Sequence, residues 1–542
     1  MPFLKNSMSN MADNALLIIK LKTIEAKKIY KTCVALLTFC IVIFAFSCKS
    51  GTNINIDSVA SPKGTEVFQP DWENIAENYQ FPQWFCDAKF GIFIHWGVYS
   101  VPAFGSEWYS RYMYQKGTKE YDHHIETYGD QTKFGYKDFI PLFKFEKFDA
   151  DEWAKLFKAS GAKYVIPVAE HTDGFSMYDS DLNEWNSVKM GPEKDLVGLL
   201  KQSVEKEGLV FGLSSHRAEN AWFFGVGMEF PSDVQDMSIQ LYGGRLAEET
   251  YADDIAKEWL TRTYELVNKY QPELVWFDWT VNDSILMPYF NKFMAYYYNC
   301  ALDWGKQVVV NTKQGYPTNV QVWDMERGKS DKMMKFPWQT DTSIGKKSWS
   351  YIDDEENKTP EQIVHDLIDI VSKNGNMLLN IGPRADGTIT EEQQSVLLNI
   401  GKWLNVNGEA IYSSRCWKKF GEGETESTKG TFTDHTASAY TVQDIRFTTK
   451  GNDFYAITLN WDDNEVIIKS LNKDAVADAK IINVRMLGSD EKIEWEQTEQ
   501  GLRLSFPKVK PCDYAFTFKI SFDKEVGAHL ESEASNEVLK HG

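Results

Sequence analysis

Short apolar runs alternate with amphipathic stretches along most of this chain. The apolar runs are rich in β-branched and aromatic residues, which is typical of strands buried on both faces. The stretches between them repeat apolar positions at helical spacing, which predicts helices that cover a sheet. The predicted strands are 90–96, 164–170, 210–215, 274–279, 308–312, 320–324 and 377–381, and the helices between them include 151–159, 195–207, 255–270 and 360–372.

Strands buried on both faces and separated by helices predict a parallel sheet. A closed (β/α)₈ barrel and an open doubly wound sheet both fit this pattern. No GxGxxG or P-loop motif follows any of the predicted strands, so the nucleotide-binding forms of the open sheet lose support.

The carboxyl ends of successive predicted strands carry polar residues, and this favours the barrel. In a barrel such residues converge on one mouth, where (β/α)₈ proteins hold their active sites. Charged residues also end strands simply because strands end at the surface, but three of the nine histidines fall at such ends. The strand-end residues are His95, His171, Ser214 to His216, Asp278, Asn311, Lys313 and Glu326.

The pattern changes after Tyr412, where strand-like runs recur without a long helix. Runs at 437–442, 453–459, 465–469, 481–485 and 513–520 are separated by turn signals, which predicts an antiparallel β-sandwich. The predicted organisation is therefore a tether at 49–68, a (β/α)₈-like catalytic domain at 69–412, a sandwich at 413–522 and a polar tail at 523–542.

Residues 1–48 have the pattern of an export signal. A lysine-rich region precedes an apolar run at 33–46 that is short for a membrane-spanning helix, and a small residue stands directly before Cys48. We expect a lipoprotein signal peptide with lipid on Cys48, and a protein located in the periplasm or at the outer membrane. An uncleaved signal anchor is the alternative.

Four cysteines follow Cys48, and their spacing is not that of a metal site. The sequence does not decide whether Cys416 and Cys512 form a disulfide.

The composition narrows the function classes. The chain has 542 residues and a formal net charge of −20, and it lacks a basic stripe, which argues against nucleic acid as a partner. Aromatic residues make up 14% of the chain, including 18 Trp. Flat aromatic rings suit the apolar faces of sugars, although they also fill ordinary protein cores.

Two strand-end carboxylates suit glycoside hydrolysis, which needs one group to attack or stabilise the anomeric carbon and another to protonate the leaving oxygen. Asp278 stands between two tryptophans and fits the first role. Glu326 fits the second, with Asp324, Glu107, Asp341 and Asp173 as competitors. A metal site built from the strand-end histidines is the rival chemistry, but neither HxH nor HExxH occurs. No GxSxG elbow supports a serine hydrolase.

Several motifs resemble glycoside hydrolase family 29, the α-L-fucosidases. They are the run from Lys89 to Pro102 (KFGIFIHWGVYSVP), Ser-Glu-Trp-Tyr at 106–109, His-Thr-Asp-Gly-Phe at 171–175, Trp-Phe-Asp at 276–278 and Asn-Ile-Gly-Pro at 380–383. The resemblance spans about residues 70 to 415.

The family resemblance implies a barrel followed by a sandwich, no metal or organic cofactor, and retaining hydrolysis of terminal α-L-fucosyl groups on oligosaccharides or polysaccharides. It implies Asp278 as the nucleophile and Glu326 as the acid/base, with their carboxyl groups about 5 to 5.5 Å apart. The expected substrate-binding residues are His95, Trp96, Glu107, Trp108, His171, Thr172, His216, Trp276 and Lys313.

Three positions depart from the family pattern. Thr172 stands where a second histidine usually follows the first, Lys313 where many members have arginine or another long donor, and Gln339 where a glutamate usually follows tryptophan. The space left by the missing imidazole at position 172 either admits a larger sugar or is filled by a neighbouring residue such as His216. The alternatives to a fucosidase are therefore an α-L-galactosidase and an inactive glycan-binding lipoprotein.

Overall fold

The computed structural model describes residues 64, 66–279, 281–313, 315–425, 429–434, 438–462, 465–474 and 479–526. The predicted signal peptide, Cys48, most of the tether and most of the polar tail lie outside these residues. Within this part of the chain, no helix is both long and apolar enough to cross a membrane.

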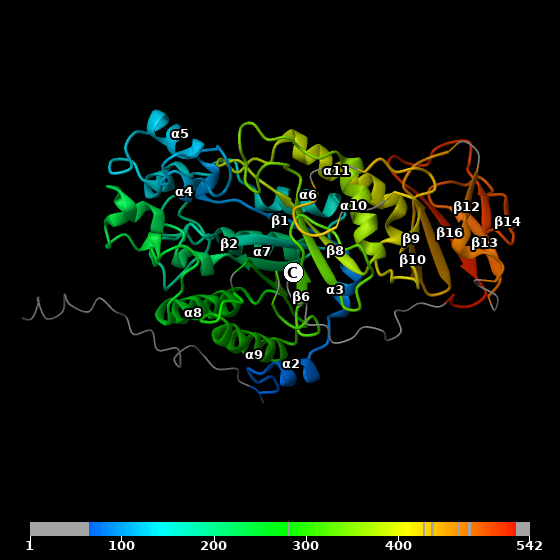
Figure 1. Ribbon diagram of the computed structural model, residues 1–542, viewed down its shortest axis with the longest axis horizontal. Helices are drawn as coiled ribbons and strands as arrows, with labels where there is room; N and C mark the ends of the chain where they lie inside the picture. Colours follow the sequence, from blue (N-terminus) through cyan, green and yellow to red (C-terminus); the bar gives the residue numbers. More distant parts are fainter. Residues whose placement is uncertain are drawn as a thin grey trace, which may run out of the picture. The chain divides into compact units, whose positions relative to one another are not determined.

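Eight parallel strands of the described chain close into a barrel, which confirms the predicted fold class (Figure 1). β1 pairs with β2 on one side and with β8 on the other, and the second pairing closes the ring. Nearly every residue of these strands is buried, as the apolar runs predicted for all of them except β7. The strands are β1 (Phe90–Ile94), β2 (Tyr164–Glu170), β3 (Val210–Ser215), β4 (Leu274–Phe277), β5 (Val309–Thr312), β6 (Val322–Asp324), β7 (Trp338–Ser343) and β8 (Gly375–Ile381).

The sequence pattern did not reveal β7. After Trp338 this strand reads Gln-Thr-Asp-Thr-Ser, yet all six of its residues are buried. Its polar side chains find partners inside the protein, for example Thr340, whose hydroxyl donates to the carbonyl of Gly328 at 3.0 Å. A hydropathy pattern cannot identify a buried strand whose side chains are paired polar groups.

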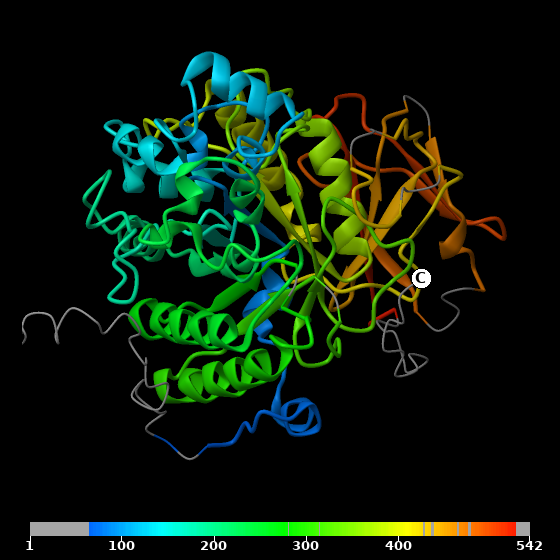
Figure 2. The same cartoon turned by 60° about the vertical axis from the view of Figure 1, so that its left-hand side comes forward.

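Helices cover the outside of the barrel, and polar caps fix where several of them begin (Figures 1 and 2). Asp195 accepts from the backbone N–H of Gly198, and Thr359 precedes Pro360 and accepts from Gln362 N–H, so both satisfy otherwise unpaired groups of a first turn. The outer helices are α6 (Ala150–Ala159), α7 (Leu196–Lys206), α8 (Asp253–Tyr270), α9 (Met287–Trp304), α10 (Pro360–Ser372) and α11 (Glu391–Asn407).

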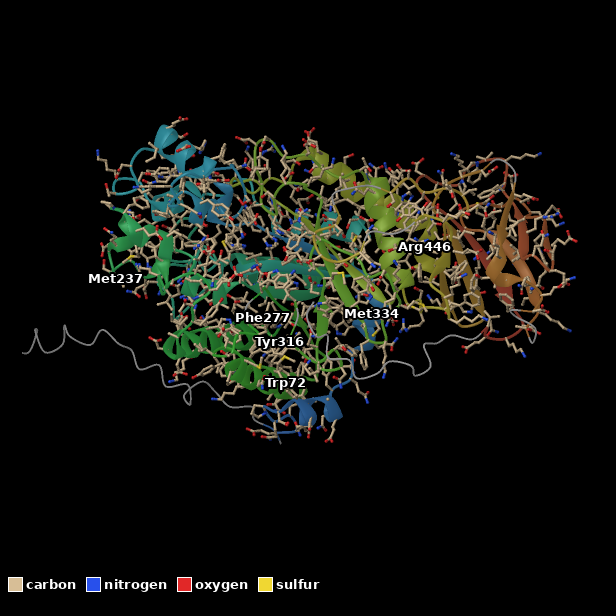
Figure 3. All side chains as sticks on the ribbon, in the orientation of Figure 1. Trp72, Met237, Phe277, Tyr316, Met334 and Arg446 are labelled. Carbon is tan, nitrogen blue, oxygen red and sulfur yellow. The ribbon has the colours of Figure 1, made fainter. Side chains whose placement is uncertain are left out.

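The connections after β1 and β3 are long and carry short helices. The connection after β1 contains η2 (Val98–Ser100), α4 (Tyr109–Tyr112), α5 (Lys119–Thr127) and η3 (Tyr136–Leu142). The connection after β3 contains η4 (Arg217–Ala221), η5 (Gly225–Glu229), η6 (Asp233–Gln235) and η7 (Gln240–Tyr242). Two further helices, α2 (Trp72–Asn78) and α3 (Gln83–Ala88), precede the barrel. Figure 3 labels Trp72 of α2, which packs against Tyr316 with ring centroids 5.2 Å apart. This contact attaches the N-terminal helix to the barrel.

Two antiparallel sheets follow the barrel and share one apolar core, as the predicted sandwich requires. The larger sheet has the order β13-β16-β11-β10-β9 and the smaller one β12-β15-β14. The segments are η8 (Gly408–Ala410), β9 (Gly421–Glu422), β10 (Ile445–Lys450), β11 (Asp453–Thr458), β12 (Glu465–Ile468), η9 (Lys469–Leu471), β13 (Ile481–Met486), β14 (Trp495–Gln497), β15 (Leu502–Ser505) and β16 (Phe516–Phe522).

The strand predicted at 437–442 is wrong. Its described residues, 438–442, are not in a strand, and Thr441 opens a turn in which Asp444 accepts from the backbone N–H and the hydroxyl of Thr441. The strand begins at Ile445 instead. Cys416 and Cys512 are free thiols, so the structure does not contain the disulfide that the sequence left open.

Polar contacts join the sandwich to α10 and α11. The guanidinium of Arg446, labelled in Figure 3, donates to Asp369 of α10 at 2.6 Å, and both side chains are buried. Trp403 of α11 donates from its indole nitrogen to the carbonyl of Ala515 at 2.9 Å. The sandwich therefore packs on the outer helices of the barrel.

Candidate active site

The carboxyl ends of the barrel strands carry a compact set of predicted site residues. β1, β2 and β3 are each followed at once by an imidazole, β4 by a carboxylate, β5 by a lysine, and β6 by a carboxylate two residues on. All but Asp278 are less than a tenth exposed. The residues are His95, His171, His216, Asp278, Lys313 and Glu326.

Three imidazoles form one side of this mouth. The ring centroids of His171 and His216 are 4.6 Å apart, and His95 lies 5.3 Å from His216 and 5.7 Å from His171. One nitrogen from each ring lies within 4.8 Å of the others, which is close enough to share a metal ion or neighbouring hydroxyl groups. The HxH and HExxH motifs could not reveal this cluster because its members come from three strands.

A hydrogen-bond network sets the tautomer of His95. Asn380 of β8 donates its amide nitrogen to the carbonyl of Trp349, so its amide oxygen must accept. That oxygen lies 2.8 Å from His95 Nδ1, which therefore carries the proton. The remaining nitrogen, Nε2, is left as an acceptor suited to a sugar hydroxyl.

Burial is the largest cause that lowers the pKa of both His95 and His171 well below the usual range, and the neighbouring imidazoles add to it. The two rings are therefore neutral at pH 7.

The turn that follows His171 depends on Gly174. The φ of Gly174 is +79°, in the left-handed region, and a Cβ there would approach the carbonyl oxygen of Leu241 to 2.4 Å.

Asp278 is held through both carboxyl oxygens. His216 Nδ1 lies 2.8 Å from Oδ2, and the backbone N–H of Trp279 donates to Oδ1 at 2.9 Å. Burial disfavours the charged form, but His216 and then Lys313 outweigh it and lower the pKa of Asp278 to about 2. The carboxylate is therefore ionised at neutral pH, as a nucleophile requires.

Lys313 organises the other side of the mouth. Its ammonium lies 2.8 Å from Asp341 Oδ2, 3.1 Å from Asp324 Oδ1 and 3.4 Å from Glu326 Oε2. It also lies 4.6 Å from the ring centroid of Trp276, over the face of that ring. Lys313 is therefore the hub of a buried carboxylate cluster, and it also lies against a predicted sugar-binding tryptophan.

Gln339 occupies the position where a glutamate was expected. Its amide nitrogen donates to Asp324 Oδ2 at 2.7 Å, and its oxygen accepts from the hydroxyl of Tyr164 at 2.8 Å. An ionised glutamate could only accept hydrogen bonds and would add another negative charge to this cluster. The amide therefore suits the carboxylates that this chain already places there.

Glu326 is joined to the nucleophile loop by Trp279, a residue that the sequence did not single out. The indole nitrogen of Trp279 donates to Glu326 Oε2 at 2.6 Å, while its backbone N–H donates to Asp278. Lys313 approaches the same oxygen, so the protein engages Oε2. The predicted separation of the two carboxyl groups stays a prediction.

Glu107 supports the site through a loop. Its Oε2 accepts from the backbone N–H of Trp349 at 3.1 Å and from the hydroxyl of Ser348 at 3.2 Å. This brings the Trp349 ring to 5.2 Å from that of His95. Burial raises the pKa of Glu107, with hydrogen bonds and Arg327 acting against it. Trp349 joins the site from the loop after β7, and neither a motif nor a predicted strand end marks it in the sequence.

The remaining predicted binding residues fall into different surroundings. Trp108 is half-buried and packs on Phe223, with centroids 5.2 Å apart, in the loops that flank the mouth. The Thr172 hydroxyl lies 2.9 Å from His171 Nδ1. Trp96 donates to the carbonyl of Arg384 and packs on Trp153, so its contacts are those of a core residue and do not support sugar binding.

Glu219 is a buried carboxyl that the sequence analysis missed. It lies on η4, three residues after His216, and is 5% exposed. Burial, followed by the charges of Asp278 and Glu326, raises its pKa well above the usual range. The only sequence signal for Glu219 was its place shortly after a strand end.

Asp173, which competed for the acid/base role in the sequence, accepts from the hydroxyl of Tyr136 at 2.6 Å.

A barrel mouth with two carboxylates, neutral imidazoles and tryptophans defines a glycoside hydrolase. The family model for α-L-fucosidase matches residues 56–409, and the model for the α-L-fucosidase C-terminal domain matches residues 439–521. The chain therefore belongs to the α-L-fucosidase family, glycoside hydrolase family 29, which confirms the resemblance read from its motifs.

Known relatives agree with this assignment over most of the chain. Tissue α-L-fucosidase from Homo sapiens is 33% identical over 482 residues, which cover 86% of this chain and 94% of that protein. Plasma α-L-fucosidase from Homo sapiens is 32% identical over 474 residues, which cover 84% of this chain and 92% of that protein. The crystal structure of Thermotoga maritima α-fucosidase is 32% identical with a TM-score of 0.67, and the match covers 84% of this chain and 100% of that one.

Proposed function

We propose that this protein removes terminal α-L-fucosyl groups from glycans by double displacement. The observation that carries the proposal is the ionised Asp278 held through both oxygens at the barrel mouth. The relatives described above are α-L-fucosidases that match over nearly their whole length, and the T. maritima enzyme has also been solved in complex with fucose.

In the first step, an oxygen of Asp278 attacks the anomeric carbon while Glu326 protonates the leaving glycosidic oxygen. The bond from carbon to the leaving group breaks, and a fucosyl ester of Asp278 forms. In the second step, Glu326 removes a proton from water, which displaces Asp278 from the anomeric carbon. The neutral imidazoles of His95 and His171 are suited to hydrogen-bond the sugar hydroxyls in both steps.

The test is turnover of 4-nitrophenyl glycosides of α-L-fucose, α-L-galactose and β-D-galactose. We expect the α-L-fucoside to be the best substrate and the first product seen by NMR to be the α anomer, because two displacements restore the configuration. Release of the β anomer would contradict double displacement. No turnover of any of these glycosides would favour the inactive glycan-binding alternative.

The proposed location is the periplasm or the outer membrane, through lipid on Cys48. The sequence of residues 1–48 supports this proposal, since it combines a basic region, a short apolar run and a small residue before cysteine. Cells that express the chain and are fed an alkyne-tagged fatty acid should label the wild-type protein but not Cys48→Ser. Equal labelling of both would contradict the lipid anchor.

A further inference from the structure

The side chain of His216 connects the nucleophile to the imidazole cluster. Its ring is 2% exposed and packs between His171 and Trp276, with centroid distances of 4.6 and 4.9 Å. Its Nδ1 contacts Asp278, and its Nε2 lies 3.2 Å from the hydroxyl of Ser214. Both ring nitrogens therefore have partners from the ends of β3 and β4.

The charge on Asp278 fixes the proton on His216. An ionised carboxylate only accepts hydrogen bonds, so Nδ1 must be the donor. The other ring nitrogen, Nε2, lies 3.2 Å from the Ser214 hydroxyl. The result is a chain of hydrogen bonds that runs from Ser214 through His216 to Asp278 and points its last proton at the nucleophile.

Few groups can keep Asp278 ionised in this place. Lys313 and the Trp279 backbone N–H are the other favourable neighbours, while Glu219 is acidic and its pKa is raised in part by the charge of Asp278, so it offers no stabilisation. The remaining imidazoles, His95 and His171, are neutral at pH 7. Among these groups His216 is the largest influence that opposes the cost of burying the carboxylate.

Position 172 cannot provide this contact. Thr172 has no imidazole, and its hydroxyl is engaged with His171 Nδ1, while its carbonyl accepts from Asn220 at 2.7 Å. His216 comes from the next strand and completes the cluster of three rings. The third imidazole of this site is thereby brought into direct contact with the nucleophile.

We infer that His216 is a positioning residue that orients the Asp278 carboxylate and keeps it ionised through Nδ1–H, in addition to supplying the third ring of the sugar site. This inference rests on the proposed function, because it assigns Asp278 the role of nucleophile. A residue that only filled space or only contacted sugar would change substrate affinity without changing the protonation of Asp278.

The test compares His216→Asn with His216→Leu. The amide nitrogen of asparagine is attached to Cγ, as Nδ1 is, so it can still donate to Asp278, whereas leucine cannot. In the wild type we expect no loss of kcat/KM from Asp278 protonation above about pH 3, since its pKa is about 2. His216→Leu should move the acid limb of kcat/KM upward by at least about one pH unit and lower kcat at pH 5.

His216→Asn keeps the hydrogen bond but loses the electrostatic influence of the imidazole, so its acid limb should lie between those of the wild type and the leucine variant, whatever happens to KM. His365→Asn is the matched control, because His365 is a buried histidine outside the site that contacts the carbonyl of Tyr514 at 3.0 Å. It should leave the limb unchanged. Equal acid limbs for the wild type, the leucine variant and the asparagine variant would overturn the inference.

A measurement without substrate separates this inference from the proposed function. With a lowered pKa, Asp278 stabilises the wild-type fold above its ordinary pKa, and this contribution is lost as the pH falls toward 2. In His216→Leu the pKa should be raised, so stability should instead be lost as the pH rises. The difference between the Tm of the wild type and the Tm of His216→Leu should therefore increase as the pH rises from about 3 to 6.

A wild-type protein that turns over no fucoside but shows this widening Tm difference would sink the proposed function while the contact between His216 and Asp278 stands. A constant Tm difference together with active wild-type enzyme would sink the inference alone. Circular dichroism spectra that match the wild type show that each variant is folded.

Discussion

The two sides of the barrel mouth differ in how they handle charge. The side formed by β1 to β3 presents imidazoles, and His95 and His171 are neutral at pH 7 because burial lowers their pKa. The side formed by β5 to β7 buries an ammonium among carboxylates. Although burial disfavours the charge on Lys313, its acidic neighbours, led by Asp341, raise its pKa well above the usual value.

This difference divides the work of a glycosidase between the two sides. Neutral rings donate or accept hydrogen bonds and suit sugar hydroxyls, whereas fixed charges control which carboxyl groups hold protons. Asp278 at the end of β4 lies between the two sides and is influenced by both, through His216 and through Lys313. The comparison predicts that variants of the charged side change chemistry and stability and that variants around His95 and His171 change recognition, while His216, which contacts Asp278, links the two sides.

Asp278→Gly should have the largest effect, because it removes the nucleophile from the boundary of the two sides. We expect kcat to fall by at least about 10⁴-fold, which corresponds to about 5.5 kcal/mol of barrier. Steady-state rates with 4-nitrophenyl α-L-fucoside measure the loss. Added azide should restore part of the turnover by attacking the anomeric carbon in place of the carboxylate. A variant that keeps more than about a tenth of the rate would place the nucleophile elsewhere.

Glu326→Ala should depend on the leaving group. Natural glycans need protonation of a poor leaving group, so we expect their hydrolysis to slow by about 10² to 10⁴-fold, while activated aryl fucosides lose far less in the first step. Comparing kcat/KM for a fucosylated oligosaccharide and a dinitrophenyl fucoside measures this. Equal losses on both substrates would assign the acid to another group, for which the buried Glu219 is the next candidate.

Lys313→Met should destabilise the charged side. The ammonium contacts Asp324, Asp341 and Glu326 in a buried place, and its removal leaves negative charges without a counterion. We expect a loss of about 3 to 5 kcal/mol in the free energy of unfolding, measured by urea denaturation.

The double variant Lys313→Met/Asp341→Asn serves as the control for that loss. It replaces the acidic group that lies 2.8 Å from the ammonium with a neutral amide and should recover part of the stability. A single variant that loses less than about 1 kcal/mol would mean that the cluster does not depend on this ammonium.

Most of the barrel could be predicted because its strands are apolar and buried on both faces. β2 and β3 begin and end where the sequence pattern placed them. β7 could not be predicted, since its buried side chains are mostly polar and find their partners in other parts of the chain, as Thr340 and Thr342 do. The missed strand also carries Asp341 and Gln339, so the pattern gave no view of how the carboxylates are arranged around Lys313.

The identities of the principal site residues could be predicted from strand ends, but their pairing could not. His216 and Asp278 are 62 positions apart and meet only because β3 and β4 are neighbours in the barrel. The indole nitrogen of Trp279 donates to Glu326, which lies 47 positions further along the chain. Such contacts depend on loop geometry, which a single sequence does not encode in any local pattern.

Thr172→His should have the smallest effect and tests the imidazole side. The sequence left two alternatives: threonine opens room for a larger sugar such as an α-L-galactoside, or His216 fills the space. The contacts favour the second, because the ring of His216 already stacks 4.6 Å from His171 and the Thr172 hydroxyl is engaged with His171 itself. A pocket that merely tolerates an added hydroxyl discriminates by about a hundredfold or less in any case.

We therefore expect Thr172→His to leave the ratio of kcat/KM for fucoside over galactoside within about threefold of wild type, which is less than about 0.7 kcal/mol. Thr172→Val, which keeps the size but removes the hydroxyl, is the matched variant and should weaken both substrates alike by releasing His171. A ratio that rises more than about tenfold in Thr172→His would show that position 172 lines the pocket and that the space is open to larger sugars. The space at position 172, where an imidazole is absent, would then determine which sugar binds, and the three imidazoles of the site would not.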